Sequence, residues 1–292
     1  MYRRILVVTG DQPWVDAPVE YAIALAVHTG AELSLLTVLI PPLIAGMPDV
    51  PYCSPVVLES IVEQSEAVWA SAVALAEQAG VEYTRHVRWG NTADVILHTA
   101  AEDDCDLIIV GSYACTWRGR RLLRHVIKKL TACARQPLLV VTEPPEESYR
   151  GVQWLRLLVV RDDSPGGAAA LHYALTLAQE AGLDVCLLHV NALRQQYEID
   201  PLSGVYRMQD MLTLAEAHTA IAGASHDVVY ASGNPIPAIV ETATTRECDV
   251  VVLGVAPLGW KCLLYRHMAR EVIANTTRPV LLVNPLVACG YS

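Results

Sequence analysis

The feature that most constrains this chain is an internal repeat whose period is close to half of its 292 residues. Residues 106–111 read DLIIVG and residues 249–254 read DVVVLG, 143 positions later. At the same offset, the Gly-Asn pair at 90–91 recurs at 233–234. An ordered series of matches with so long a period indicates duplication of a whole domain rather than a stack of short repeats.

Two further matches show where the copies differ in length. Residues 137–141 match 279–283 at an offset of 142, whereas residues 5–8 match 157–160 at 152. The first copy therefore has about nine additional residues in its first half. The stretch 41–55 is rich in proline, which predicts a loop, so we place the insertion there.

Within each copy, short runs of Val, Ile and Leu alternate with longer amphipathic stretches. This alternation predicts βαβ units, and hence an α/β chain of two tandem open twisted parallel sheets, five strands each, with helices on both faces. The expected strands are 5–8, 33–39, 83–87, 107–110 and 138–141, then 157–160, 184–190, 227–230, 250–253 and 280–283. The expected helices are 15–29, 58–79, 92–101 and 122–134, then 167–180, 208–221, 236–245 and 265–275.

The segment 143–151 contains a Pro pair and several charges, which is typical of a domain boundary. We therefore expect domains at 1–144 and 152–292, each long enough to bury a core. Hydrophobic residues make up 53% of the chain and charged residues 18%, which excludes a disordered protein. Because the chain has no Phe, its core must be aliphatic, which suits buried parallel strands.

Charge and cysteine usage narrow the function classes. The net charge of −10 argues against binding of nucleic acid or an anionic membrane through overall charge. The eight cysteines form no CxxC motif and no metal-ligand spacing with histidine. Cys186 lies in an apolar run, while Cys105 and Cys248 precede strands, so we expect all three to be inert core residues.

Targeting and catalytic motifs bear on localisation and activity. The N-terminus has no signal-peptide core, and no apolar stretch approaches the length of a membrane span, which together predict a cytoplasmic protein. No P-loop, GxSxG elbow or HExxH motif is present, so we expect neither catalysis nor a bound metal.

Eight segments resemble, in their order, the motifs of a tandem universal stress protein with two such domains in one chain. They are 90–96 (GNTADVI), 106–112 (DLIIVGS) and 136–141 (QPLLVV), then 157–164 (LLVVRDDS), 187–190 (LLHV), 233–235 (GNP), 249–254 (DVVVLG) and 279–283 (PVLLV). The resemblance implies the fold of universal stress proteins and adenine-nucleotide alpha-hydrolases. In the nucleotide-binding members, ATP lies at the carboxyl ends of the strands, on a GxxGx9G[ST] loop after the fourth strand.

The chain departs from that loop pattern in both copies. The first glycine is kept, but the second is replaced by Ala114 and by Pro257, and the final Gly-Ser pair by Arg-His. Proline has no N–H donor and alanine disfavours positive φ, so we expect phosphate binding of this kind to be degenerate. The resemblance assigns to the loop Gly111, Arg124 and His125 in the first copy, and Gly254, Arg266 and His267 in the second.

On the adenine side, the resemblance is better kept in the second copy. Asp162 stands at the acidic position after the first strand, whereas the first copy has Gly10 there and Asp11 one place later. The backbone contact to adenine falls at Val190 and at Val38. If ATP or AMP binds, we therefore expect it mainly in the second domain.

The shared Arg-His pair has two open interpretations. It is a solvated helix start inherited from before the duplication, or its side chains replace the glycine loop and hold a small anionic ligand, since arginine grips phosphate or carboxylate bidentately. The first copy adds a basic helical face, which is either solvated or a docking site for an acidic protein or a lipid-like anion. Its residues are Arg118, Arg120, Arg121, Arg124, His125, Lys128 and Lys129.

These observations predict a non-catalytic cytoplasmic stress-response protein with degenerate nucleotide or anion sites at the strand carboxyl ends. One alternative is an ATP- or AMP-binding regulator that uses the second domain, with or without slow hydrolysis. Another is a scaffold that binds an acidic protein or a lipid-like anion through the basic helix. The resemblance also implies pairing of the copies through 138–141 and 281–283, as an internal pseudo-dimer, and further assembly into a homodimer.

Overall fold

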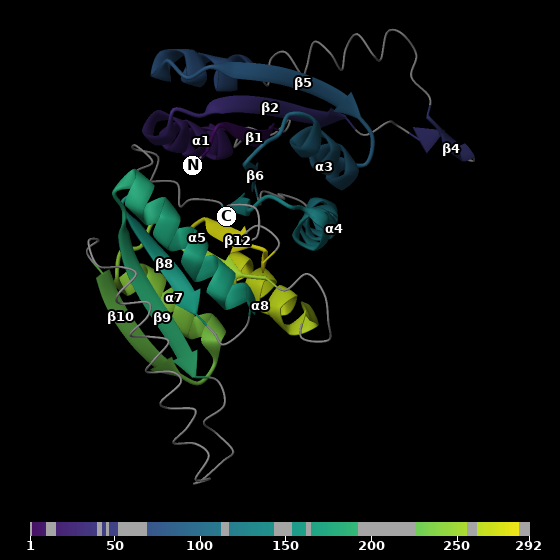
Figure 1. Ribbon diagram of the computed structural model, residues 1–292. Coiled ribbons are helices and arrows are strands. Elements are labelled where there is room, and N and C mark those ends of the chain that lie inside the picture. The colour runs from purple at the N-terminus through teal and green to yellow at the C-terminus, as the bar shows by residue number, and fades with distance from the viewer. Residues whose placement is uncertain are drawn as a thin grey trace. The chain divides into compact units, whose positions relative to one another are not determined.

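The computed structural model describes residues 2–9, 16–39, 43–44, 47–51, 69–111, 117–142, 154–161, 165–191, 226–255 and 262–285. The chain divides into two compact units, Met1–Gln153 and Trp154–Ser292. Each unit is built on five parallel strands with helices packed on them (Figure 1). The expected α/β architecture of two tandem parallel sheets is therefore confirmed.

The main sheet of unit 1 has an aliphatic core, as the absence of Phe requires. Its strands are β1 (Arg4–Thr9), β2 (Glu32–Leu39), β5 (Tyr83–Trp89), β6 (Leu107–Gly111) and β7 (Leu138–Val141). Their order is β7-β6-β1-β2-β5, and every neighbouring pair is parallel. The order reverses at β1, which is typical of doubly wound sheets that place a ligand crevice at the carboxyl ends of the strands.

Helices cover both faces of this sheet. The helices are α1 (Asp16–Thr29), α3 (Thr92–Glu102) and α4 (Trp117–Cys133), and residues 69–79 are also helical. Trp69 donates its indole N–H to Thr37 Oγ1, whereas Asp103, at the end of α3, accepts from Ser34 Oγ. Ser34 and Thr37 lie three residues apart on β2, so their side chains point to opposite faces. The 69–79 helix and α3 therefore pack on different faces.

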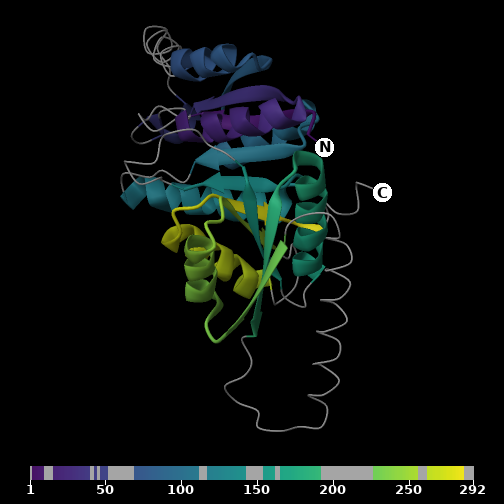
Figure 2. The same cartoon turned by 90° about the vertical axis from the view of Figure 1, so that its left-hand side faces the viewer.

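Unit 2 repeats this arrangement. Its strands are β8 (Arg156–Arg161), β9 (Asp184–Asn191), β10 (His226–Ser232), β11 (Val250–Gly254) and β12 (Val280–Val283). Its helices are α5 (Pro165–Ala181), α7 (Pro235–Thr245) and α8 (Cys262–Asn275). The parallel strands follow the order β10-β9-β8-β11-β12. Figure 2 shows α5 on one side of these strands and α7 and α8 on the other.

The two units also share their strand register. Arg4 of β1 is level with Glu32 of β2, and Arg156 of β8 is level with Asp184 of β9. Each of these pairs forms an ion pair, with N–O distances of 2.7 and 3.5 Å respectively. The duplication therefore extends from the sequence to the alignment of the strands and to the charges that join them.

Two features differ from the sequence-based expectation, the 41–55 stretch and the starts of α4 and α8. The 41–55 stretch, expected to be a loop, contains the antiparallel pair β3 (Leu43–Ile44) and β4 (Met47–Pro51), because both strands of a two-stranded ribbon are edges and tolerate proline. Both α4 and α8 begin earlier than expected, at Trp117 and Cys262. The predicted 208–221 helix and the 58–68 part of the 58–79 helix lie outside the described residues.

Candidate functional site

The glycines and valines that the resemblance assigns to a ligand lie at the carboxyl edge of each sheet. Gly111 and Gly254 are the last residues of β6 and β11. Val38 and Val190 are the penultimate residues of β2 and β9, and both are half-buried. Parallel strands end at one edge, so each sheet brings its glycine and its valine to the same side.

Two of the assigned residues, Asp11 and Asp162, lie outside the described residues. Their role as the acidic residues of an adenine site therefore stays a prediction. The loop residues Ala114 and Pro257 also lie outside the described residues.

Gly254 ends β11 directly against the first turn of α5. A Cβ atom at position 254 would lie 2.1 Å from the backbone C and O of Gly166 and 2.5 Å from the N of Gly167. Non-bonded carbon atoms need a separation of about 3.5 Å, so no larger residue fits unless the helix moves. The glycine is therefore explained by packing within unit 2, and no ligand is required to account for it.

The backbone that follows Gly254 is also engaged within the unit. The N–H of Val255 donates to the carbonyl oxygen of Val283 at 2.9 Å. A phosphate-binding loop must offer N–H groups that the protein leaves free for the ligand. At this position unit 2 offers none.

In unit 1, the ends of β1 and β2 are closed by the protein's own side chains. Thr9 Oγ1 donates to the carbonyl oxygen of Leu36 at 3.2 Å and lies 2.7 Å from Thr37 Oγ1. Thr37 Oγ1 in turn accepts the indole N–H of Trp69 at 2.7 Å, and the Arg85 guanidinium lies 5.3 Å from the Trp69 ring centre. All three linked side chains are buried. No local motif marks this contact, because Trp69 and Thr37 are far apart in the sequence.

In unit 2, residues of a different chemical type occupy the positions that match Thr9 and Thr37. Arg161 of β8 is level with His189 of β9, which is level with Tyr230 of β10. The His189 and Tyr230 rings are in edge-on contact, with centres 6.3 Å apart, and Tyr230 is 65% exposed. Arginine pairs with anionic groups and aromatic rings stack on planar ones, so these residue types at one level of the sheet suit a ligand that has both. The buried Thr9–Thr37 pair of unit 1 has no such capacity.

The Arg-His pairs do not stand at helix starts, so that part of the expectation is wrong. Arg124 is the eighth residue of α4 and Arg266 the fifth residue of α8, because both helices begin earlier than predicted. The helix macrodipole acts mainly within the first turn, so these cations do not oppose it strongly. His125 and His267 are exposed, and His267 Nδ1 lies 3.7 Å from Glu271 Oε1. The side chains of Arg124 and Arg266 lie outside the described part.

The repeated Gly-Asn pairs are helix starts. Asn91 accepts hydrogen bonds from the N–H groups of Ala93 (3.2 Å) and Asp94 (3.4 Å), and Asn234 accepts one from Ile236 (3.1 Å). The preceding Gly90 and Gly233 have φ of +145° and +109°, a conformation that other residues rarely adopt. This motif is therefore explained by N-capping of α3 and α7.

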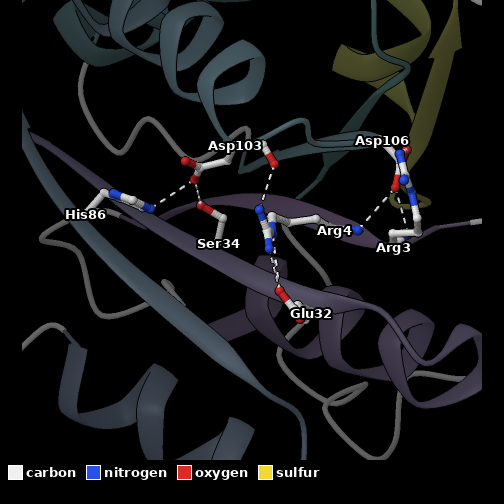
Figure 3. A network of polar contacts seen from close by, with 7 residues as sticks. All are labelled: Arg3, Arg4, Glu32, Ser34, His86, Asp103 and Asp106. Atoms are coloured by element: carbon white, nitrogen blue, oxygen red, sulfur yellow. Dashed lines mark hydrogen bonds and ion pairs between the residues drawn. The ribbon is translucent and has the colours of Figure 1, made fainter.

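The repeated aspartates lie at the opposite, amino-terminal edge of the sheets. Asp106 Oδ2 accepts the N–H groups of Arg3 (2.6 Å) and Arg4 (3.1 Å), as Figure 3 shows. In unit 2, Asp249 Oδ2 accepts those of Leu155 (2.8 Å) and Arg156 (2.7 Å). Each carboxylate thus holds the start of the first strand of its unit, away from any ligand at the carboxyl edge.

At this edge unit 1 adds contacts through the carboxylate of Asp103, where unit 2 has Arg246. Asp103 Oδ2 accepts from Ser34 Oγ (2.7 Å) and lies 2.9 Å from His86 Nε2 (Figure 3). Arg4 donates to the carbonyl oxygen of Asp103 at 2.9 Å and pairs with Glu32. The hydrogen bond to Glu32 raises the pKa of Arg4, which stays charged. These contacts tie β1, β2 and β5 to the end of α3, a structural role.

Within the described residues, no three His, Cys, Asp or Glu side chains gather as a metal site would require. Across the same part of the chain, no helix has the length and apolar character that crossing a bilayer demands.

Comparisons with known proteins agree with the duplication and the fold. The model of the universal stress protein family matches residues 1–142 and again 154–284. No protein with a curated functional description matches the chain. A universal stress protein from Archaeoglobus fulgidus superposes with a TM-score of 0.70 at 18% identity, covering 96% of either chain. A protein from Pseudomonas aeruginosa described as a universal stress protein gives a TM-score of 0.66 at 19% identity, covering 99% of this chain and 96% of its own.

Proposed function

Because this chain belongs to the universal stress protein family, we propose that it is a non-catalytic, cytoplasmic stress-response protein with degenerate nucleotide or anion sites. The tight contact of Gly254 with the backbone of Gly166 carries this proposal. It accounts for the one glycine that unit 2 retains from the family's phosphate loop. Because the N–H of Val255 donates to the carbonyl oxygen of Val283, this N–H is not free to bind a phosphate group.

The nucleotide site of unit 1 is more degenerate than that of unit 2. Its Thr9–Thr37–Trp69 contact fills the ends of β1 and β2 with buried side chains. A planar ligand at this place would have to break the bond between Trp69 and Thr37 and leave a buried N–H unpaired, at a cost of about 1–3 kcal/mol.

A specific observation favours unit 2 for the alternative function, an ATP- or AMP-binding regulator. The row Arg161–His189–Tyr230 supplies a cation and two rings at the carboxyl edge. Asp162 would add the acidic group that the family resemblance assigns to adenine. In this alternative the phosphate is held by a side chain rather than by a glycine loop.

Thermal unfolding of the full chain with ATP, ADP or AMP at millimolar concentration separates these functions. A ligand at 100 times its dissociation constant adds about 2.7 kcal/mol of stability, which a calorimeter resolves. We expect no change in Tm for any of the three nucleotides. A rise in Tm that disappears in Arg161→Ala, but persists in the register-matched Thr9→Ala of unit 1, would replace the proposal by the nucleotide-binding alternative.

The scaffold alternative depends on α4. His125 and Lys128 are exposed there, while Lys129 forms an ion pair with Asp94 of α3. Native mass spectrometry of the purified chain tests for a co-purifying anion, and sedimentation velocity tests the predicted homodimer. An acidic partner captured by the wild type but not by Lys128→Glu would favour the scaffold.

A further inference from the structure

Helix α4 of unit 1 carries its basic residues in two adjacent rows (Figure 1). An α-helix places residues i, i+4 and i+8 in one row along its surface, with a rise of about 6 Å from each to the next. The first row consists of Arg120, Arg124 and Lys128, and the second of Arg121, His125 and Lys129. The helix contains no Asp or Glu. Its basic residues therefore form one continuous band.

The described side chains show which side of α4 carries this band. Val126 and Leu130 are buried within the unit, whereas His125 and Lys128 are exposed. Lys129 Nζ lies 2.5 Å from Asp94 Oδ1 of α3, and both side chains stay about half exposed. Of the three described basic residues, only Lys129 is paired with a described carboxylate. The band thus lies opposite the buried side of the helix.

Unit 2 provides a matched comparison, because α8 is the corresponding helix. At an offset of 142, its two rows are Cys262, Arg266, Arg270 and Leu263, His267, Glu271. Glu271 stands where α4 has Lys129. Its Oε1 lies 2.9 Å from Arg270 Nη2 and 3.7 Å from His267 Nδ1. The fold therefore accepts a helix here that neutralises its own cations, and α4 is not such a helix.

The basic band of α4 also opposes the stability of the helix itself. Like charges four residues apart on a helix repel each other, whereas opposite charges at that spacing stabilise it. Arg118 and Arg120 lie in the first turn, where the helix has no acidic residue and where its macrodipole disfavours cations. An anionic partner relieves both repulsions. This favours a docking surface over a face that is only solvated.

The charge of the rest of the chain selects the kind of anionic partner. Outside α4 the chain has 31 acidic residues and only 15 Lys and Arg. A membrane or a nucleic acid extends beyond the helix, so the negative charge of the remaining surface repels it. A short acidic segment contacts the helix alone, and charges farther away than about 8–10 Å are screened at physiological salt.

The spacing of the rows fits an extended segment. Side chains on one face of an extended chain recur about every 6.6 Å, close to the step of about 6 Å along each row of α4. An acidic residue at every second position of the segment therefore meets successive basic residues of one row. Arginine binds a carboxylate through two parallel hydrogen bonds, and lysine adds a point charge.

We propose that α4 docks an extended segment of a partner protein that carries Asp or Glu at alternate positions. This surface gives the scaffold alternative of the proposed function a defined class of ligand and rests on that alternative. It does not depend on the nucleotide sites, because α4 binds through its outer face. Failure of the docking therefore leaves the degenerate sites as they are, and nucleotide binding in unit 2 leaves the docking as it is.

Fluorescence anisotropy of a labelled peptide tests the docking on the full chain. The probe is a ten-residue peptide with Glu at every second position and Ser between, and in the control peptide each Glu is replaced by Gln. We expect the Glu peptide to bind, with an affinity that falls as salt rises, and the Gln peptide not to bind. A peptide of the same composition with its Glu residues in one block should bind more weakly.

Variants of exposed residues locate the binding surface. Lys128→Glu should weaken binding about tenfold or more, because an attractive contact becomes repulsive, and Lys128→Arg should retain it. Arg270→Glu, at the matching position of α8, should leave the dissociation constant unchanged. Circular dichroism shows that each variant is folded, and Lys128→Gln is the milder substitution if Lys128→Glu is not.

Three results would overturn the proposal. One is an affinity for the Glu peptide that is the same in Lys128→Glu and Lys128→Gln as in the wild type. Another is equal binding of the alternating peptide and either the block or the Gln peptide. The third is binding of the wild type to phosphatidylserine vesicles without binding of the peptide, which would identify the partner as a membrane surface.

Discussion

Replacing Gly254 by alanine tests whether this glycine is kept for packing. The new Cβ would lie 2.1 Å from two backbone atoms of Gly166, more than 1 Å inside the separation that carbon atoms need. Neither neighbour is a flexible side chain, because the contact is with the first turn of α5, and α5 packs against β8, β9, β11 and β12. The helix or the strand must therefore move.

Overpacking of a well-packed interior costs about 1–3 kcal/mol, and a clash between two backbones belongs at the upper end of that range. We expect Gly254→Ala to lower the free energy of unfolding of unit 2 by about 3 kcal/mol. For a unit of this size that corresponds to a fall in Tm of roughly 10 °C. The measurement is differential scanning calorimetry of the full chain without any ligand.

Gly182→Ala is the matched control in the same unit. Its φ is +67° and nothing lies within 4 Å of an added Cβ, so only backbone strain of about 1 kcal/mol is expected. Gly166→Ala, with its nearest contact at 3.2 Å, should fall between the two. A loss for Gly254→Ala no larger than that for Gly182→Ala would refute the packing argument and would leave ligand binding as the reason for the glycine.

Five further substitutions probe the repeated motifs and the buried thiol of Cys105. Asn91→Ala should lower the free energy of unfolding of unit 1 by about 1 kcal/mol in chemical denaturation. Asn234→Ala should cost unit 2 less, because Asn234 caps a single N–H, and equal losses would contradict this expectation. Asp249→Ala should cost about 2 kcal/mol, since two backbone donors lose a charged acceptor, whereas Asp249→Asn keeps one oxygen and should cost less. Burial raises the pKa of Cys105 from 9.0 to about 12, so between these values the unfolded chain binds fewer protons and stability falls as pH rises. In denaturation curves, Cys105→Ala should reduce the fall of the unfolding free energy between pH 9 and 11 by up to about 1.4 kcal/mol per pH unit. An unchanged slope would contradict the raised pKa of Cys105.

Local patterns predicted most of the fold. The apolar runs at 107–110 and 138–141 coincide with β6 and β7 to within one residue, because a fully buried parallel strand needs an uninterrupted run of Val, Ile and Leu. The start of α4 is not predicted because residues 117–121 lack apolar side chains at helical spacing, and α8 begins three residues before the expected 265–275 helix. The proline-rich 41–55 stretch predicts a loop, but proline excludes only a central strand, and the short β3–β4 pair forms there.

The candidate site was predicted less completely, because its meaning depends on contacts between distant residues. The sequence repeat marks the glycines at 111 and 254, yet a close approach of two backbones and a phosphate loop both demand glycine. Only the position of Gly166 distinguishes them in unit 2. Similarly, the Gly-Asn pair at 90–91 marks a helix cap only once the hydrogen bonds of Asn91 are known.

The sequence by itself therefore determined the duplication, the parallel α/β sheets and the aliphatic core, since all of these follow from periodicity and composition. The tertiary structure decided what the two copies do differently with the same fold. It placed Trp69 on Thr37 in unit 1 and set Arg161 level with His189 in unit 2. These contacts join residues of different strands and helices, and their chemistry depends on distances of a few ångström that no local pattern encodes.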